Sequence, residues 1–251
     1  TNIGALCAAV AKAPPGKVRH FLLGNNVCCE GSAMEGADAL ASLIVDKRQT
    51  IQTWYLAGNA IDSDSIGTIA RAFQQNDRAD ALWLKRNPIK AQGAAHLGSM
   101  LLVNTSLQLL DLDNTGILDN GVAALLNPLI ASKERVHLRH LYLGANGITD
   151  KGAETISRFI EAHPYALETL YLQMNPLGSS GAVRIANALT RAAACLNGNS
   201  PALKRLSLAS CRLDDTALAA VTRAAEACGL VCLDVGYYKS TRALGERPNV
   251  F

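Results

Sequence analysis

The sequence predicts an α/β repeat protein in which each unit is a β-strand followed by an α-helix. The first observation is that the stretch "LRHLYLGANGI", which begins at Leu138, recurs along almost the whole chain. The second is that an apolar pattern with helical spacing follows the copies. The third is bulk composition: 251 residues, with 49% hydrophobic and 18% charged residues, support a sizeable core and argue against disorder.

The recurring stretch has seven near-copies and a final incomplete one. The full copies begin at Val18, Ile51, Ala79, Leu107, Leu138, Leu167 and Leu203, and the incomplete copy, "LVCLDVGYY", begins at Leu230. The spacing between copies stays close to about 28 residues, with insertions in three of the units. A fixed period of this length is the signature of a stacked repeat architecture.

Each unit carries the periodicities of its two elements. The LxL core alternates with period two, as a strand with one buried face must. The helical pattern appears at Ile66, Ile69 and Phe73; at Val122, Leu125, Leu126 and Leu129; and at Ala182, Ile185, Ala186 and Leu189. Gly and Asp cluster before the helices, as turns and caps require. In "IDSDSIG" we expect Ser63 or Asp64 to cap the helix.

The pattern LxxLxLxxN/CxL resembles the leucine-rich repeat of the ribonuclease-inhibitor-like subclass, over nearly the whole chain. The resemblance implies an α/β solenoid, or horseshoe, with parallel strands on the concave face and helices on the convex face. In that family the ninth position satisfies backbone groups in the turns between repeats. This chain places there Asn26, Asn59, Asn87, Thr115, Asn146, Asn175 and Cys211. Cys is a family alternative, whereas Thr115 departs from the pattern.

We expect one leucine-rich repeat domain over residues 1–251, because a single repeat cannot bury its own face. Residues 1–17 are predicted to form an N-terminal helix, as a half repeat or a cap, which "APPG" ends. Residues 18–235 hold seven full repeats and a final strand. Residues 236–251 are a tail that we expect to cover part of the last repeat, since an open sheet edge is otherwise a pairing hazard.

Register assigns a direction to the residue between the last two leucines of LxxLxL. The leucines point into the core, so this residue points onto the concave face. The eight copies place there Leu22, Tyr55, Trp83, Asp111, Tyr142, Tyr171, Ser207 and Asp234. Neighbouring strands lie ~4.8 Å apart, so these side chains form a ladder. Trp54 and Phe21 occupy leucine positions and are expected in the core.

The aromatic members of the ladder are candidate partner-binding residues. Protein-binding surfaces use amphipathic aromatics with adaptable polar neighbours, although cross-strand packing alone also favours aromatics on strands. The predicted site comprises Tyr55, Trp83, Asp111, Tyr142 and Tyr171, flanked by Lys85, Arg86, Asp113 and His140. Asp111 and Asp113 form either an acidic notch for a basic side chain of the partner or a solvated pair at a strand end.

Other function classes find little support in the sequence. We expect no enzyme, because the phosphate-loop, dinucleotide and serine-hydrolase motifs are absent and the five histidines lack ligand spacing. We therefore also expect no catalytic residues, no cofactor and no metal. A net charge of +3 is too balanced to indicate a nucleic-acid or membrane partner. Seven irregularly spaced cysteines indicate reduced thiols, and we expect a cytoplasmic monomer.

The leading hypothesis is a non-enzymatic module that binds a protein or peptide ligand through the concave sheet. Two alternatives stay open because the fold permits both. One is a GTPase-activating protein of the Ran GTPase-activating type, although no residue match carries it and the acidic tail of that family is absent. The other is the ligand-sensing or host-targeting part of a larger receptor or effector, and a bacterial effector would be delivered to a host cell. Fold analogy alone is a weak warrant for any of them.

Overall fold

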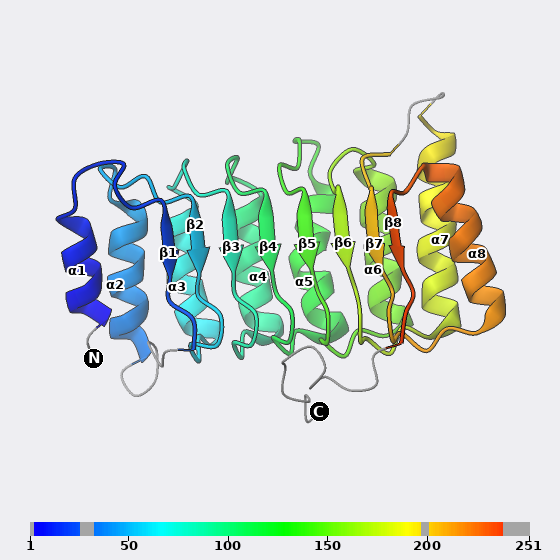
Figure 1. Cartoon of the computed structure of the whole chain (residues 1–251), viewed down its shortest axis with the longest axis horizontal. Helices are drawn as coiled ribbons and strands as arrows, with labels where there is room; N and C mark the ends of the chain where they lie inside the picture. The colour runs from blue at the N-terminus through cyan, green and yellow to red at the C-terminus, as the bar shows by residue number, and fades with distance from the viewer. Residues whose placement is uncertain (1–2, 26–32, 197–200, 238–251) are drawn as a thin grey trace.

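A computed structural model describes residues 3–25, 33–196 and 201–237. The described residues form eight helices and eight strands that alternate along the chain (Figure 1). The strands make one parallel sheet in the order β1 to β8, so that neighbours in sequence are neighbours in space. The predicted α/β solenoid is confirmed.

All eight strands are three residues long and lie in one register. They are β1 His20–Leu22, β2 Thr53–Tyr55, β3 Ala81–Trp83, β4 Leu109–Asp111, β5 His140–Tyr142, β6 Thr169–Tyr171, β7 Arg205–Ser207 and β8 Cys232–Asp234. Each residue pairs with the equivalent residue of the next repeat, for example Leu110 with Leu141 and Leu141 with Leu170. Equivalent positions therefore form straight rows across the sheet.

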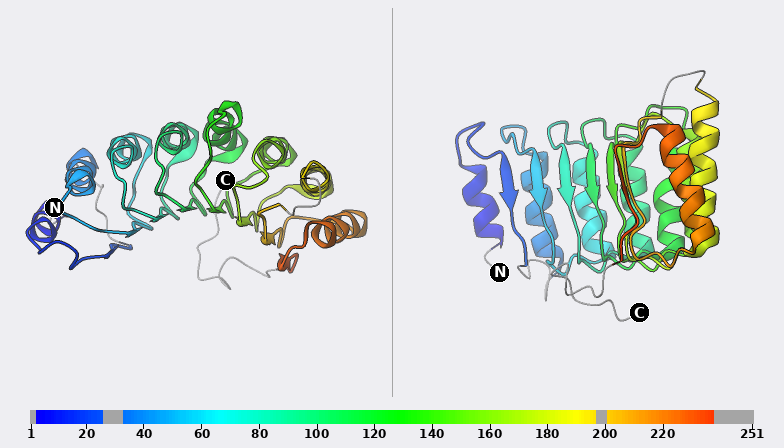
Figure 2. Two further views of the ribbon diagram at one scale, coloured as in Figure 1. Left: turned by 90° about the horizontal axis from the view of Figure 1, so that it is seen from above. Right: turned by 45° about the vertical axis from the view of Figure 1, so that its right-hand side comes forward.

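The helices cover one side of the sheet. They are α1 Ile3–Ala11, α2 Ala33–Val45, α3 Ser63–Phe73, α4 Lys90–Leu101, α5 Leu118–Ala131, α6 Asp150–Ala162, α7 Gly178–Ala194 and α8 Asp215–Cys228. Seen from above in Figure 2, the strands follow the inner side of an arc and the helices follow its outer side. Among the described residues no helix covers the concave face of the sheet, and the convex face is helical.

The core lies between the two layers. The middle residue of the first seven strands is buried, and the apolar stripe of each of α3 to α8 packs against these residues. Trp54 and Phe21 are buried as predicted, with ring centroids 5.3 Å apart, and Trp54 also contacts Phe73 at 5.9 Å. Burial of such apolar surface is the dominant favourable contribution to folding.

Buried asparagines tie successive repeats together. Asn87 Nδ2 donates to Leu56 O (2.9 Å) in the preceding repeat and to Leu84 O (2.7 Å) in its own. Its Oδ1 accepts from Asn59 N (2.8 Å) and Ile61 N (3.0 Å). Each amide thereby satisfies backbone groups that would be costly to bury alone.

Thr115 changes this arrangement because a hydroxyl cannot replace both halves of an amide. In the loop before it, Ile89 N donates to Asn87 O (2.8 Å), and Lys90 N donates to Thr115 O (3.1 Å). Lys90 has a left-handed backbone, with φ of 57°. Cys211 is associated with the same hydrogen-bond pattern in the loop before it. A similar helix start also occurs before an asparagine, because Leu118 has φ of 55° and its N donates to Asn146 O (3.2 Å), so the loss of asparagine does not by itself account for this start.

Helix caps follow two patterns. Asp62 precedes α3 and accepts from Ser65 N at 2.9 Å, so the expected cap at Ser63 or Asp64 was wrong by one or two residues. The reason is that Asp62 keeps an extended backbone, as a capping residue must, whereas Ser63 is already helical. By contrast, α4 begins after Ile89 without a side-chain cap.

The two ends of the stack meet the expectations only in part. Helix α1 precedes β1 and packs against α2. Residues 238–251 lie outside the described residues, so the covering role of the tail stays a prediction. Asn26, Cys28 and Cys29 also lie outside them.

Candidate functional site

The predicted ladder occupies the last position of each strand, on the concave face. Leu22 pairs with Tyr55, Tyr55 with Trp83 and Trp83 with Asp111. The row continues from Asp111 through Tyr142 and Tyr171 to Ser207 and Asp234. The register alone therefore brings the four aromatic candidates onto one line.

The four rings form a continuous chain of contacts. Tyr55 and Trp83 have ring centroids 6.1 Å apart, and Tyr142 stacks on Tyr171 at 4.9 Å with an interplanar angle of 17°. Trp83 and Tyr142 come from strands that are not adjacent, yet their rings meet edge to face at 5.8 Å. These are the separations at which aromatic pairs attract one another. All four side chains are partly exposed, so each ring keeps a free surface.

Asp111 behaves differently from the sequence expectation. It belongs to the outward row, but it is only 2% exposed. Trp83 and Tyr142 make their contact across its strand, β4, which accounts for the burial. Its Oδ1 accepts from Asp113 N at 2.9 Å. The structure therefore shows a covered carboxylate rather than an open notch at Asp111.

Asp113 is bound into the rim of the sheet. Its Oδ1 accepts from Gly144 N at 2.5 Å, and its Oδ2 accepts from Gln173 Nε2 at 3.0 Å. The side chain thus links the loops after β4, β5 and β6. An added Cβ at Gly144 would lie 2.4 Å from Gln173 Nε2 and 3.0 Å from Asp113 Oδ1, so a larger residue there would displace the side chains that make these bonds.

The surroundings of Tyr142 affect its ionisation. Burial raises the pKa of Tyr142, and the nearby Tyr171, Asp111 and Asp113 add to the increase. The phenol of Tyr142 therefore stays neutral at physiological pH. A neutral phenol offers a partner one hydrogen-bond donor on an otherwise apolar ring.

His140 lies in the neighbouring row of the concave face. Its Nδ1 is 3.0 Å from Thr169 Oγ1, and the same pairing occurs between His20 and Thr53. Burial lowers the pKa of His140. The imidazole is therefore mainly neutral at physiological pH, and it acts as a fixed hydrogen-bonding group rather than a cation.

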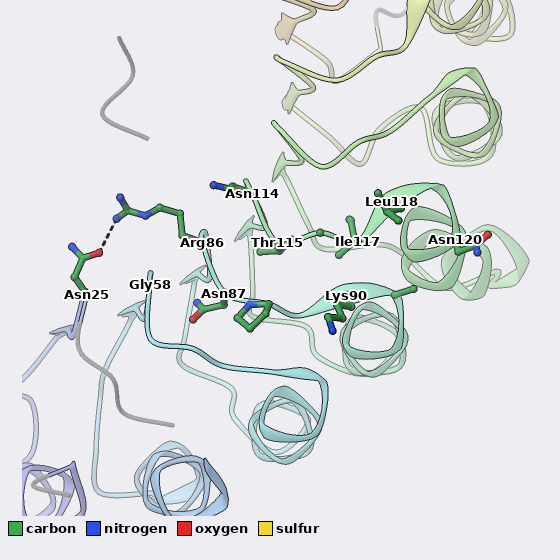
Figure 3. Close-up of a pocket in the computed structure, with 13 residues that line it drawn as sticks. Asn25, Gly58, Arg86, Asn87, Lys90, Asn114, Thr115, Ile117, Leu118 and Asn120 are labelled. Carbon is green, nitrogen blue, oxygen red and sulfur yellow. Dashed lines mark hydrogen bonds between the residues drawn. The ribbon is translucent and has the colours of Figure 1, made fainter. Parts of the chain in front are cut away.

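Lys85 and Arg86 follow β3 and are partly exposed. Arg86 Nη2 donates to Asn25 Oδ1 at 3.1 Å, so its side chain reaches from the third repeat to the first (Figure 3). The Nε of Arg86 is buried and has no hydrogen-bond partner among the described residues. Arg86 consequently lies along the rim rather than under the aromatic rings.

A hollow at the edge of the sheet was not predicted from the sequence. A hollow of about 880 Å³ lies at the carboxyl ends of β1 to β4, and Arg86, Lys90 and Leu118 are among its lining residues (Figure 3). Leu118 and Lys90 both have left-handed backbones, which no propensity of Leu or Lys predicts. Thr115 marked the turn that pairs with Lys90, but Leu118 pairs with Asn146, which follows the pattern, so the sequence held no signal for Leu118.

Neither a metal-binding cluster nor a membrane-spanning helix occurs among the described residues. No group of three or more His, Cys, Asp or Glu side chains is placed to hold a metal ion there. Within the same residues, every helix is too short or too polar to cross a membrane.

Comparisons with known proteins identify the repeat. A family model described as Leucine Rich repeat matches residues 103–126 and 136–157. NACHT, LRR and PYD domains-containing protein 9 of Bos taurus is 28% identical over 218 residues, which is 86% of this chain and 21% of that protein. The ribonuclease inhibitor of Sus scrofa is 25% identical over 147 residues, or 58% of this chain and 32% of the inhibitor.

Among solved structures, that of leiomodin-1 actin-binding site 2 aligns with a TM-score of 0.43 and 14% identity, over 76% of this chain and 88% of that one. The chain spans about a fifth to a third of the length of the two curated relatives above. The residues that the family model matches hold strands β4 and β5 and the first part of each helix that follows them. The family model and these relatives support a leucine-rich repeat protein of the ribonuclease-inhibitor-like type.

Proposed function

We propose that this chain is a non-enzymatic interaction module that binds a protein or peptide ligand on its concave sheet. The observation that supports this most is the chain of ring contacts from Tyr55 through Trp83 and Tyr142 to Tyr171. Partly exposed Tyr and Trp side chains at the centre of a surface are the residues that dominate binding energy in protein interfaces.

The ring contacts also lower the cost of binding. A side chain that is already held by its neighbours loses less conformational freedom when a ligand covers it. Trp83 and Tyr142 each contact a ring on both sides, so both are held before a partner arrives. The flanking Lys85 and His140 supply polar groups of the kind that surround such anchors.

A competing explanation is that the rings only stabilise the sheet. Cross-strand aromatic pairs contribute to stability without any ligand. This explanation predicts that alanine substitutions lower the free energy of unfolding and leave ligand binding unchanged. The two explanations therefore separate when stability and binding are measured on the same variants.

The relatives support an interaction role and leave its setting open. The Sus scrofa relative is named for inhibiting a ribonuclease, which is itself a protein. The match to NACHT, LRR and PYD domains-containing protein 9 covers most of this chain but only 21% of that protein. A sensing region within a larger receptor is therefore the second candidate, and the full-length reading frame of the gene would decide it.

The test uses short random peptides displayed on phage and selected against the folded chain. Selected peptides are synthesised, and their affinities are measured for wild type and for Trp83→Ala, Tyr142→Ala and Tyr171→Ala. Each substitution is expected to weaken binding by about 1–4 kcal/mol if the residue is a hot spot. Glu154→Ala, on the exposed surface of α6, is the matched control that should leave affinity unchanged.

Hydrogen exchange of wild type with and without peptide provides a readout that does not depend on the variants folding. Protection is expected on β2 to β6. Unchanged affinity in all three folded variants, or protection confined to the convex helices, would refute concave-face binding.

A further inference from the structure

The hollow at the carboxyl edge of the sheet is a second surface, separate from the ring chain. It is built by the loops that follow β1 to β4 and by the first residues of α4 and α5. Figure 3 shows Arg86 and Asn25 on one side of it and Ile117 and Leu118 on the other. The rings lie on the sheet face itself and do not line the hollow.

The charge of the hollow has one sign. Arg86 and Lys90 are the charged residues among those that line it, and both are basic. Asp113 precedes the lining residue Asn114, but its carboxylate is committed to Gly144 and Gln173. A negatively charged group that enters the hollow therefore meets two cations and no lining carboxylate.

Arg86 is held in place before any ligand binds. Its bond to Asn25 passes beside Gly58, where an added Cβ would lie 2.7 Å from Asn25 Oδ1. Glycine at position 58 thus leaves room for the Asn25 side chain that holds the guanidinium. The buried Nε of Arg86 remains a donor without a partner among the described residues. Because Nε is buried, only the Nη groups of this positioned guanidinium can reach a carboxylate, and a guanidinium that is already held binds it with little loss of entropy.

The side of the hollow opposite Arg86 carries Lys90 together with the apolar Ile117 and Leu118 (Figure 3). Leu118 is 47% exposed, which is high for a leucine that follows the buried Ile117. The combination of two cations with an exposed aliphatic wall fits a peptide better than a nucleic-acid backbone. A nucleic-acid backbone would need a longer row of basic residues to pair with its phosphates, and it would bring no apolar group to cover Leu118.

We propose that this hollow binds an acidic segment of a protein partner. One carboxylate of the segment pairs with Arg86 and another with Lys90, and an apolar side chain between them covers Leu118. The proposal does not require the ring chain, because its residues are different. A single partner that crosses the rim could nevertheless use both surfaces.

The experiment compares charge-reversed variants with the same displayed peptides. The variant Arg86→Glu with Lys90→Glu removes the cations, and Lys151→Glu with Arg158→Glu on the exposed face of α6 is the control with the same change in net charge. Peptides that depend on the hollow are expected to be rich in Asp and Glu. Their affinity should fall by about tenfold or more in the hollow variant and stay unchanged in the control.

Additional variants and peptides test whether charge is what the hollow recognises. If the reversed variant does not fold, Arg86→Gln with Lys90→Gln replaces it, and circular dichroism checks each protein. Amide versions of the peptides, with Asn for Asp and Gln for Glu, should bind as weakly as the acidic peptides bind the variant. The proposal is overturned if no selected peptide depends on Arg86 and Lys90, if the amide versions bind equally well, or if a single-stranded oligonucleotide displaces the peptides. Peptides whose binding depends on the aromatic rings but not on Arg86 and Lys90 would support the proposed function and not the hollow.

Discussion

Replacement of Tyr142 by alanine, in the protein alone, measures how strongly the ring chain is built into the sheet. Tyr142 contacts Trp83 on one side and Tyr171 on the other. An aromatic pair contributes about 0.5–1.5 kcal/mol beyond its buried area, so the loss of two pairs should lower the free energy of unfolding by about 1–3 kcal/mol. Tyr171 has one such contact, and Tyr171→Ala should cost about 0.5–1.5 kcal/mol through that contact.

Urea unfolding followed by circular dichroism gives both free energies, provided that the slope with denaturant stays the same in all variants. A double-mutant cycle with Trp83→Ala isolates the contact across β4, with an expected coupling of about 0.5–1.5 kcal/mol. Tyr142→Phe keeps both ring contacts and serves as the control. Equal losses for Tyr142→Ala and Tyr171→Ala, together with zero coupling to Trp83, would refute the idea that the rings support one another.

Three further predictions concern the frame that holds the surface. Asn146→Ala should lower the free energy of unfolding by about 2–5 kcal/mol in urea titrations. The substitution removes the hydrogen bonds with Leu112 O and Thr115 N and leaves these buried backbone groups unpaired. The prediction is contradicted if the loss is smaller than that caused by an alanine substitution at an exposed position. A backbone hydrogen bond from Ser65 N lowers the pKa of Asp62 in the folded state. The stability that this carboxylate contributes is therefore fully present above the unfolded carboxyl pKa of about 3.9, and it is lost as the pH falls through the lower pKa of the folded state. Asp62→Asn should therefore reduce the pH dependence of stability in that acidic range, and an unchanged profile would exclude Asp62 as a source. Burial raises the pKa of Cys211 to about 11, whereas Cys195 and Cys232 are exposed, so a thiol reagent at neutral pH should label these two before Cys211 when peptides are mapped by mass spectrometry. Labelling of Cys211 at the same rate would contradict its burial.

The strand register could be predicted because it depends on a strict pattern. The LxL alternation leaves one choice for which side chains enter the core, and Trp54 and Phe21 followed it although they are larger than leucine. The row of outward residues follows from the same alternation. Local sequence was sufficient here because each strand pairs with the equivalent residues of its neighbour.

The burial of Asp111 could not be predicted in this way. Its direction was correct, but its exposure depends on two rings that belong to β3 and β5. The hollow was missed for a related reason: Lys90 and Leu118 have left-handed backbones whose cause is the pairing between loops, not the residues themselves. Alternation determines which side a residue faces, whereas cover and loop shape depend on side chains from other repeats.

The uniform register also spaces the equivalent side chains of the concave face evenly from strand to strand. Successive residues of the ladder lie on neighbouring strands and are ~4.8 Å apart, the spacing of hydrogen-bonded strands. An extended peptide laid across them advances ~3.3–3.6 Å per residue, so its side chains drift out of step with the rungs. Side chains three or four residues apart on a helix are ~5–6 Å from one another, which stays closer to this spacing over several rungs. The mismatch between these periods limits how many rings one straight ligand can engage at once.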